Sequence, residues 1–335
     1  MNVFPHAPCG LRLGLGGAGL GNLFQAIAED DAQALLRAAL ADGCRSFDTA
    51  PHYGNGLSEH RVGRAMRDAA RDDVVISTKI GRLLTPTADA PRDQHGYVGV
   101  LPFVQRFDYT SQGVLRSLED SLQRMGLARV DVAFVHDCDA ATHGARYAEV
   151  LDQVVTQAIP ALVRAKAQGL VSYVGLGVND VAVCLDVLAR ADIDCLLLAG
   201  RYSLIDHSAL PDLLPLCAAR GVRVAIGGVF NSGILATGVR DARAPLRFNY
   251  AAAPASWVEK TRAIEDACER FGVPLRAAAL QFPLAHPAVD IVISGAQTAG
   301  QWRDAMRMMA TPIPEGFWQH LRDTALIPPD APLPH

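Results

Sequence analysis

Four side chains that can exchange or steer protons follow three successive apolar runs of the chain. Asp48 and Tyr53 come just after one run. Lys79 ends the next run, and His136 ends the one after it. A free tyrosine has a pKa of about 10 and is a poor proton donor or acceptor near neutrality, unless an adjacent ammonium stabilises its phenolate. The residue types therefore indicate proton transfer at an oxygen, as hydride exchange with a carbonyl carbon requires.

Lysine is rare in this chain, which makes the lysine of this set informative. Of the 31 basic residues 28 are arginine, and lysine occurs only at positions 79, 166 and 260. The planar fork of an arginine spreads its charge, whereas an ammonium is a compact point charge on a flexible stem. We expect Lys79 to have a chemical role, whereas Lys166 and Lys260 lie on predicted helices and have no assigned role.

The elements that must position these residues repeat eight times as an apolar run, a loop and a helical pattern. The predicted strands cover residues 11–15, 44–48, 74–78, 130–135, 171–178, 194–199, 222–227 and 290–294. The predicted helices cover roughly residues 31–42, 58–70, 110–125, 148–168, 180–190, 208–220, 256–285 (broken near Gly272 and Pro274) and 298–310. Continuous apolar strands alternating with helices predict an α/β protein with a covered parallel sheet. Eight units predict a (β/α)8 TIM barrel, with an open doubly wound sheet as the structural alternative.

No linker or compositional break divides the chain, so we expect one barrel domain over residues 1–335. Residues 311–335 are rich in proline and are expected to form a C-terminal tail over the surface or the mouth. Two long loops without evident secondary structure cover residues 81–109 and 229–255. Loops of this length in a compact domain are usually functional, and in a barrel the loops after strands form the rim of the active site.

Composition restricts the class of protein. Half of the residues are apolar and the formal charge is −4, which disfavours a disordered chain and a nucleic-acid-binding footprint. The seven cysteines are odd in number and never spaced as CxxC, and no HExxH motif or Cys/His cluster predicts a metal site. No apolar run approaches the roughly 18 residues that span a bilayer. We expect a cytoplasmic protein that binds no membrane and no metal.

The glycines at the start of the chain fit the GxGxxG pattern of a dinucleotide-binding turn, at Gly14, Gly16 and Gly19. That motif requires a helix opening at the glycines and an acidic residue about 20 positions further on. Here Asp48 lies 29 positions beyond Gly19, and helix signals begin only near Asp30. The pattern favours a barrel strand whose following loop, with Gly17, lets the backbone approach a cofactor.

In order, spacing and strand context, the four residues resemble the catalytic tetrad of the aldo-keto reductases. In that family an Asp is followed by a Tyr five residues later, by a Lys ending the next strand and by a His ending the one after. The resemblance extends from residues 13–16 to residues 293–295 and implies the (β/α)8 fold. It implies that Tyr53 is the acid/base, Lys79 its electrostatic partner, Asp48 the partner of Lys79 and His136 the donor that orients the substrate oxygen. Each residue alone has a commoner structural role, and the combination favours catalysis.

The same resemblance implies a nicotinamide cofactor across the barrel mouth. The positions implied to bind it are Asn179 for the amide, and Ser232, Gly233 and Leu235 for the pyrophosphate. Family members that prefer NADP commonly carry Lys or Arg at positions equivalent to Gly295 and Gln301. Because both are uncharged here, we expect NAD to be preferred, with NADP possible as a weaker alternative.

The resemblance is greatest to a branch of sugar 1-dehydrogenases and pyridoxal 4-dehydrogenase, through segments 48–59, 135–137, 199–202 and 230–235. It implies oxidation of the anomeric carbon of an aldose such as L-fucose, D-arabinose or L-galactose to a lactone. Substrate contacts are expected from His52, Tyr53 and His136, with Gln94, His95 and Tyr97 of the first long loop as further candidates. Where the branch usually has Pro after His-Asp, this chain has Cys138, near the site or in simple packing. The expected partner is a small sugar or aldehyde, and the expected state a monomer or homodimer.

Other functions remain open at the level of sequence. The barrel could oxidise pyridoxal or reduce aldehydes and ketones generally. A Schiff-base aldolase would use Lys79 as its nucleophile but has no need for the spacing of Asp48 and Tyr53. A nicotinamide-binding regulatory subunit is a third possibility, against which the complete tetrad argues.

Overall fold

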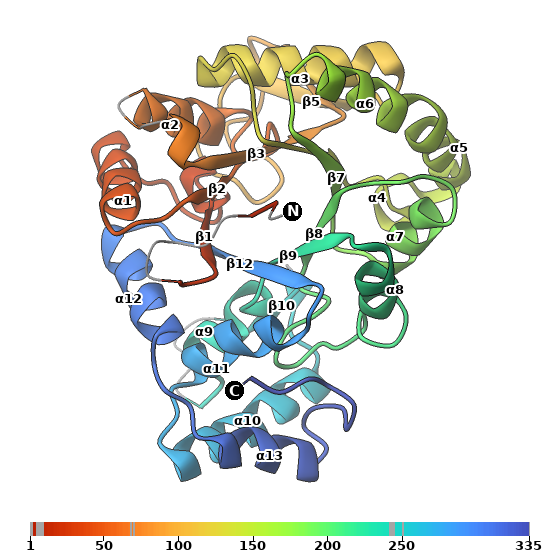
Figure 1. The fold of residues 1–335 in the computed structure, drawn as a ribbon. Helices are drawn as coiled ribbons and strands as arrows, with labels where there is room; N and C mark the ends of the chain where they lie inside the picture. The colour runs from red at the N-terminus through yellow and green to blue at the C-terminus, as the bar shows by residue number, and fades with distance from the viewer. Residues whose placement is uncertain are drawn as a thin grey trace.

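A closed barrel of eight parallel strands forms the centre of the computed structural model, which describes residues 3–4, 10–67, 69, 71–240, 245–249 and 251–334 (Figure 1). The strands are β1 Leu13–Gly16, β2 Ser46–Asp48, β3 Val75–Ile80, β6 Val132–His136, β7 Tyr173–Val178, β8 Cys195–Ala199, β9 Arg223–Gly227 and β12 Val289–Gly295. Going round the barrel, their order is β1, β12, β9, β8, β7, β6, β3, β2, and β2 returns to β1. The predicted barrel is thus confirmed, and the open sheet is wrong.

Amphipathic helices surround the strands, as the sequence pattern predicts (Figure 1). They include α1 Glu29–Ala41, α2 Leu57–Met66, α3 Ser111–Met125, α5 Tyr147–Gln153, α6 Ile159–Ala167, α7 Val181–Leu188, α8 Leu213–Arg220, α10 Ala255–Phe271, α11 Leu275–Gln281 and α12 Ala299–Met309. In α3 the Thr110 hydroxyl caps the N-terminus by accepting from Gly113 N, and Gly126 ends the helix with a positive φ. Leu118 and Met125, which belong to the apolar stripe of α3, are buried. The predicted break near Gly272 separates α10 from α11.

The glycines of β1 serve close packing inside the barrel. A Cβ on Gly14 would come within 2.6 Å of Ile293 Cδ1 and 3.0 Å of Ser46 Cβ, so these strands approach because Gly14 has no side chain. Gly16 pairs in register with Asp48 of the neighbouring strand β2. Two glycines of the dinucleotide-turn pattern, Gly14 and Gly16, therefore belong to a barrel strand, and the third, Gly19, begins a short 3-10 helix in the loop that follows.

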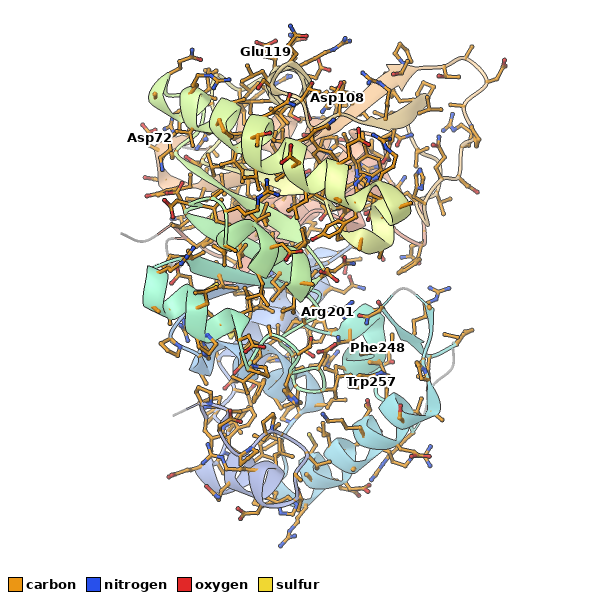
Figure 2. The ribbon with its side chains drawn as sticks, turned by 90° about the vertical axis from the view of Figure 1, so that its right-hand side faces the viewer. Asp72, Asp108, Glu119, Arg201, Phe248 and Trp257 are labelled. Atoms are coloured by element: carbon orange, nitrogen blue, oxygen red, sulfur yellow. The ribbon has the colours of Figure 1, made fainter. Side chains whose placement is uncertain are left out.

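Both long loops contain short antiparallel hairpins, so the expectation of structureless loops is wrong there. The first hairpin pairs β4 Arg82–Pro86 with β5 Phe103–Phe107, and the second pairs β10 Arg247–Phe248 with β11 Ala251–Ala252. In Figure 2 both hairpins extend toward the right-hand side of the view. The ring of Phe248 stacks on that of Trp257 in α10, with 4.4 Å between the ring centroids. Isolated hairpins are marginal in water, and here each gains stability from packing on the barrel.

The proline-rich C-terminal segment contains a helix, α13 Glu315–Asp323. Phe317, Trp318 and Leu321 are buried, and the Phe317 ring lies 6.0 Å from that of Phe271 in α10. Figure 1 shows α13 beside α10 at the edge of the barrel. This segment packs on the outer helices and is absent from the residues that line the two cavities of the barrel mouth.

The two lysines without an assigned role form structural contacts, and neither lines the two cavities of the barrel mouth. Lys166 Nζ lies 2.8 Å from both carboxylate oxygens of Asp194, at the start of β8. Lys260 Nζ donates to the carbonyl of Ile205 at 2.7 Å. Within the described residues, the structure has no helix long and apolar enough to cross a membrane.

Candidate active site

Neighbouring parallel strands bring the first two candidate residues together. Asp48 ends β2 and pairs in register with Ser77 of β3, so Lys79 lies two residues further along the adjacent strand. Residues two apart on a strand point to the same face. Lys79 Nζ lies 2.5 Å from Asp48 Oδ1 and 2.7 Å from Asp48 Oδ2, and it also donates to the carbonyl of Thr49 at 3.0 Å.

The Asp48–Lys79 pair is almost completely buried. The side chains of Asp48 and Lys79 are 4% and 1% exposed, and the Ser77 hydroxyl adds a hydrogen bond to Asp48 Oδ1 at 2.6 Å. Gly177 of β7 leaves space for the lysine, because a Cβ there would lie 2.9 Å from Lys79 Cδ. A buried ion pair with this many hydrogen bonds holds the ammonium in one position.

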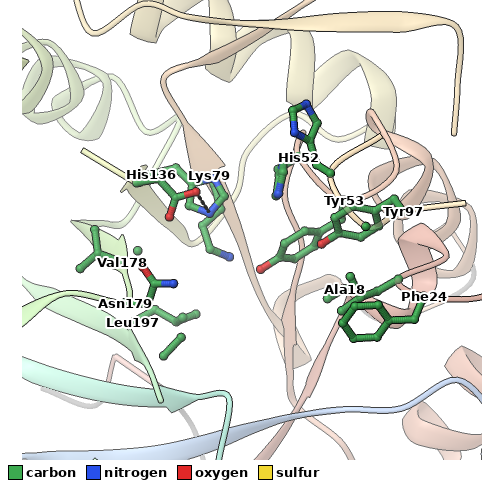
Figure 3. Close-up of a pocket in the computed structure, with 16 residues that line it drawn as sticks. Ala18, Phe24, His52, Tyr53, Lys79, Tyr97, His136, Val178, Asn179 and Leu197 are labelled. Carbon is green, nitrogen blue, oxygen red and sulfur yellow. Dashed lines mark ion pairs between the residues drawn. The ribbon is translucent and has the colours of Figure 1, made fainter. Parts of the chain in front are cut away.

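Tyr53 lies in the turn between β2 and α2, facing this ammonium. Lys79 Nζ is 5.3 Å from the centroid of the Tyr53 ring, and Figure 3 shows the two side chains facing one another at the pocket. The backbone of Tyr53 is held by a close approach of the loop after β1, since a Cβ on Gly21 would lie 2.5 Å from Tyr53 C. Three segments distant in sequence thus fix the relative position of Tyr53 and Lys79.

His136 ends β6 and completes the set. Its ring centroid lies 6.4 Å from that of Tyr53, nearly perpendicular to it, and the residue is buried. Burial, followed by the positive charges of Arg82 and Lys79, holds the pKa of His136 well below its usual range, so the ring is neutral near neutral pH. Nε2 lies 3.5 Å from Asp137 Oδ2, whereas Nδ1 is buried without a partner among the described residues.

These residues meet at a cavity of about 400 Å³ in the barrel mouth. Of the predicted residues it is lined by Tyr53, Lys79, His136, His52, His95, Tyr97 and Asn179 (Figure 3). Phe24, in the loop after β1, and Leu197, in β8, form part of the apolar wall of this cavity. The walls thus combine aromatic rings with a few polar groups, as is typical of small-molecule sites.

Gln94 does not contact this cavity, which corrects the expectation that it meets substrate. Its side-chain amide donates to the carbonyls of Pro91 and Phe103, at 2.8 and 3.0 Å. It therefore holds the turn of the first long loop that carries His95 and Tyr97. Cys138 is also structural, because it is completely buried in the hydrophobic core.

The sequence interpretation missed a polar cluster beside the cavity. Arg82, at the start of β4, is buried, forms an ion pair with Asp137 and donates to Gln105 Oε1 at 2.9 Å. Gln105 comes from β5 and also lies 2.9 Å from His52 Nδ1. Residues 82–86 (RLLTP) and 103–107 (FVQRF) do not alternate apolar and polar side chains, so the only available signal was their place in the long loop after β3, which lies at the active-site rim.

A second cavity of about 390 Å³ continues along the mouth from Tyr53 toward β9 and β12. The residues that line both cavities are Ala18, Leu23, Phe24, Tyr53, Leu197 and Ala199. Of the positions implied to bind a cofactor, it is lined by Gly17, Ser232, Gly233, Gly295 and Gln301. Asn179 lines the first cavity, where the two meet, so the implied cofactor residues extend over both.

Leu235 is the exception among the implied cofactor positions. Its side chain is completely buried in the hydrophobic core, and its backbone N–H donates to the carbonyl of Phe230 at 3.2 Å. Neither its side chain nor its N–H can contact a ligand in the groove. Residues 231–233 form a tight turn with positive φ at Asn231, Ser232 and Gly233, and Leu235 lies in the short helix α9 Ile234–Thr237 that begins directly after this turn.

The second cavity carries almost no charge. Among the described residues that line it, Asp48 is the only charged one. Gln301 Oε1 accepts from the backbone N–H of Gln297 at 2.7 Å, and a Cβ at Gly295 would meet nothing within 4 Å. This end of the groove is therefore open and uncharged over the described part of the chain.

Comparison with known proteins agrees with the geometry. The sequence model of the Aldo/keto reductase family matches residues 12–325. The chain is 42% identical over 327 residues to pyridoxal 4-dehydrogenase of Microbacterium luteolum, and 37% identical over 328 residues to D-threo-aldose 1-dehydrogenase of a Pseudomonas species, covering 94% of each chain in both cases. Among solved structures, an aldo-keto reductase from Bacillus halodurans in its holo form superposes with a TM-score of 0.71 at 23% identity, covering 95% of this chain and 92% of that one. The last similarity concerns the fold alone.

Proposed function

The chain belongs to the aldo/keto reductase family, and on that premise we propose that it is an NAD-dependent dehydrogenase that oxidises the anomeric carbon of an aldose to a lactone. L-fucose, D-arabinose and L-galactose are the proposed substrates. The observation that carries the proposal is the buried Asp48–Lys79 pair beside Tyr53, with neutral His136 facing the same cavity. An aldolase lysine would need to be a neutral amine, and Lys79 is instead held between two carboxylate oxygens.

The proton chemistry follows from these side chains. The ammonium of Lys79 stabilises Tyr53 as a phenolate, and this phenolate accepts the proton of the anomeric hydroxyl and becomes a neutral phenol. Asp48 keeps Lys79 charged and immobile. A neutral His136 donates one hydrogen bond to the substrate oxygen and thereby orients it, without competing for the proton that Tyr53 transfers.

The second cavity fits a nicotinamide dinucleotide. Its lining includes Tyr53 as well as Gly295 and Gln301, and a Cβ on Gly233 or Gly295 would meet no atom within 4 Å. We propose that Gly17, Ser232, Gly233, Gly295 and Gln301 hold the cofactor and that Asn179 contacts its carboxamide. The cofactor, when bound, supplies the hydride acceptor. The uncharged lining favours NAD over NADP, because none of the described residues that line this cavity carries a positive charge for a 2′-phosphate.

Pyridoxal is the second candidate substrate, for a specific reason. The relative at 42% identity is a pyridoxal 4-dehydrogenase, and the first cavity contains the rings of Phe24, His52 and Tyr97, against which a pyridine ring can stack. Pyridoxal closes to a cyclic hemiacetal, as aldoses do, so both substrates offer the same ring C–H and hydroxyl to the proposed machinery. The choice between them depends on groups away from the reacting carbon.

A screen of cofactor reduction tests the function. Initial rates with NAD and NADP are measured on L-fucose, L-galactose, D-arabinose and pyridoxal, with Tyr53→Phe as the control. The proposal predicts NAD reduction with at least one sugar and its loss in the variant. Turnover of pyridoxal alone would select the second candidate, and full activity of Tyr53→Phe would overturn the mechanism.

A further inference from the structure

A chain of hydrogen bonds beside the first cavity fixes which atoms donate and which accept. It begins at Asn55, whose Nδ2 lies 3.2 Å from the carbonyl of Leu101 and 2.6 Å from that of Phe103. Carbonyl oxygens only accept, so the NH₂ group of Asn55 must face them. The side-chain oxygen of Asn55 therefore faces the opposite way, toward Gln105.

The orientation of Gln105 follows from both of its neighbours. Its Nε2 donates to Asn55 Oδ1 at 2.7 Å. On its other side, Arg82 approaches Oε1 at 2.9 Å, and an arginine has only donors. Both contacts thus place the amide oxygen of Gln105 toward Arg82. The same oxygen lies 2.9 Å from His52 Nδ1.

His52 must then carry its proton on Nδ1. An oxygen acceptor requires a donor, and burial, with the positive charge of Arg82 second, lowers the pKa of His52 to about 4, so the ring is neutral near pH 7. The remaining nitrogen, Nε2, is an acceptor in that tautomer, and no described residue forms a hydrogen bond with it. His52 lines the first cavity, with its ring centroid 6.3 Å from that of Tyr53 and 5.9 Å from that of His136.

We propose that His52 Nε2 accepts a hydrogen bond from the substrate hydroxyl next to the reacting carbon, and that Gln105 and Arg82 are positioning residues that maintain this acceptor. The inference rests on the proposed function and specifies its substrate class, aldoses with a free hydroxyl at C2. That hydroxyl is the one nearest the anomeric oxygen, which Tyr53 and His136 bind. An analogue without it leaves a buried acceptor unpaired, and such sites reject the analogue strongly.

The kinetic test compares D-arabinose with 2-deoxy-D-ribose, which is the same pentose without its C2 hydroxyl. The wild-type enzyme is expected to prefer D-arabinose in kcat/KM by roughly 10- to 100-fold. In His52→Phe, which keeps a ring but removes the acceptor, that preference is expected to fall to about 3-fold or less. The matched control is His95→Phe, because His95 lines the same cavity but no hydrogen bond links it to Gln105. The control is expected to keep the wild-type preference.

A second readout requires no turnover. In ¹⁵N NMR spectra of the ligand-free enzyme at pH 7, assigned by comparison with His52→Phe, His52 Nδ1 is expected to be protonated and Nε2 unprotonated. Gln105→Leu removes the oxygen that fixes this tautomer, so a mixture of tautomers and a smaller preference for D-arabinose are expected. Gln105→Glu retains an oxygen toward His52 and is expected to keep Nδ1 protonated. A merely structural role for Gln105 would change stability without changing the tautomer.

The possible results separate the two proposals. If D-arabinose is oxidised and 2-deoxy-D-ribose reacts equally well, or if His52→Phe keeps the preference, this inference is overturned while the proposed function stands. If Nε2 carries the proton, the inference is overturned regardless of the kinetics. If no sugar reacts while NMR shows an unprotonated Nε2, the proposed function and the assigned substrate class both fail, and only the tautomer is supported.

Discussion

Lys79 Nζ and Asp48 Oδ1 lie 2.5 Å apart inside the barrel, in side chains that are 1% and 4% exposed. Removing both charges from water costs several kcal/mol each, and only their mutual attraction and hydrogen bonds offset that cost. Each side chain therefore depends on the other for its burial. In the proposed mechanism this pair supplies the fixed positive charge beside Tyr53, since Lys79 Nζ lies 5.3 Å from the centroid of the Tyr53 ring.

Lys79→Met is expected to lower the free energy of unfolding by about 3 kcal/mol, because it leaves Asp48 buried without its cation. The double variant Asp48→Asn/Lys79→Met removes both charges and is expected to regain most of that loss while remaining inactive. Urea denaturation combined with initial rates measures both effects. A double variant no more stable than Lys79→Met would show that the pair is not coupled as described.

Tyr53→Phe is expected to lower kcat by about 10²- to 10⁴-fold, the usual contribution of general acid–base catalysis. The ring keeps its packing beside Tyr97, 6.0 Å away, so NAD binding should change little. Steady-state rates together with fluorescence titration of NAD separate the two quantities. A variant that loses cofactor affinity in proportion to its rate would assign Tyr53 to binding instead.

Gln301→Arg is expected to increase affinity for NADP about tenfold with little effect on NAD, because a guanidinium at the start of α12 can bind the 2′-phosphate. The Thr298 hydroxyl still caps this helix, so its fold should be preserved. Gln301→Glu is the matched control and should weaken NADP binding by charge repulsion. Dissociation constants for both cofactors check the prediction, and a wild-type preference for NADP would contradict it.

Acid is expected to destabilise the protein through its buried histidines. Burial and the nearby charge of Lys260 lower the pKa of His207 to about 4, whereas an unfolded histidine titrates near 6.5. Because the unfolded chain binds the proton more readily, the stability that His207 contributes is complete above pH 6.5 and is lost as pH falls toward 4. Between pH 7 and 4.5 the loss from this group is about 2 kcal/mol.

His207→Asn removes the titrating group, so its unfolding free energy should fall less over that pH interval than that of the wild type. Urea denaturation at pH 7 and pH 4.5 gives this change in unfolding free energy for the wild type and for the variant. For each protein, the unfolding free energy at pH 4.5 is subtracted from that at pH 7. A loss of stability that the substitution causes equally at both pH values therefore cancels. An equal fall in both proteins would mean that His207 is already protonated in the fold.

Local pattern was sufficient to predict the strands that carry the catalytic candidates. Lys79 and His136 end apolar runs, and the order of these runs places them on adjacent barrel strands β3 and β6. Local pattern did not reveal that Leu235, which the resemblance implied to bind the cofactor, is buried in the core. It follows a turn with positive φ values at residues 231–233. Such backbone conformations at non-glycine residues leave little trace in composition.

The sequence by itself determined the eightfold repeat and the residues that meet where strand ends converge, because parallel barrel strands must place their carboxyl ends on one face. Tertiary structure alone decided which polar groups surround them. Gln105 reaches His52 across 53 positions of sequence, and Arg82 reaches Asp137 across 55. The docking of the β4–β5 hairpin on the barrel rim sets these contacts, and docking depends on the shape of both surfaces. No periodicity within one segment encodes it.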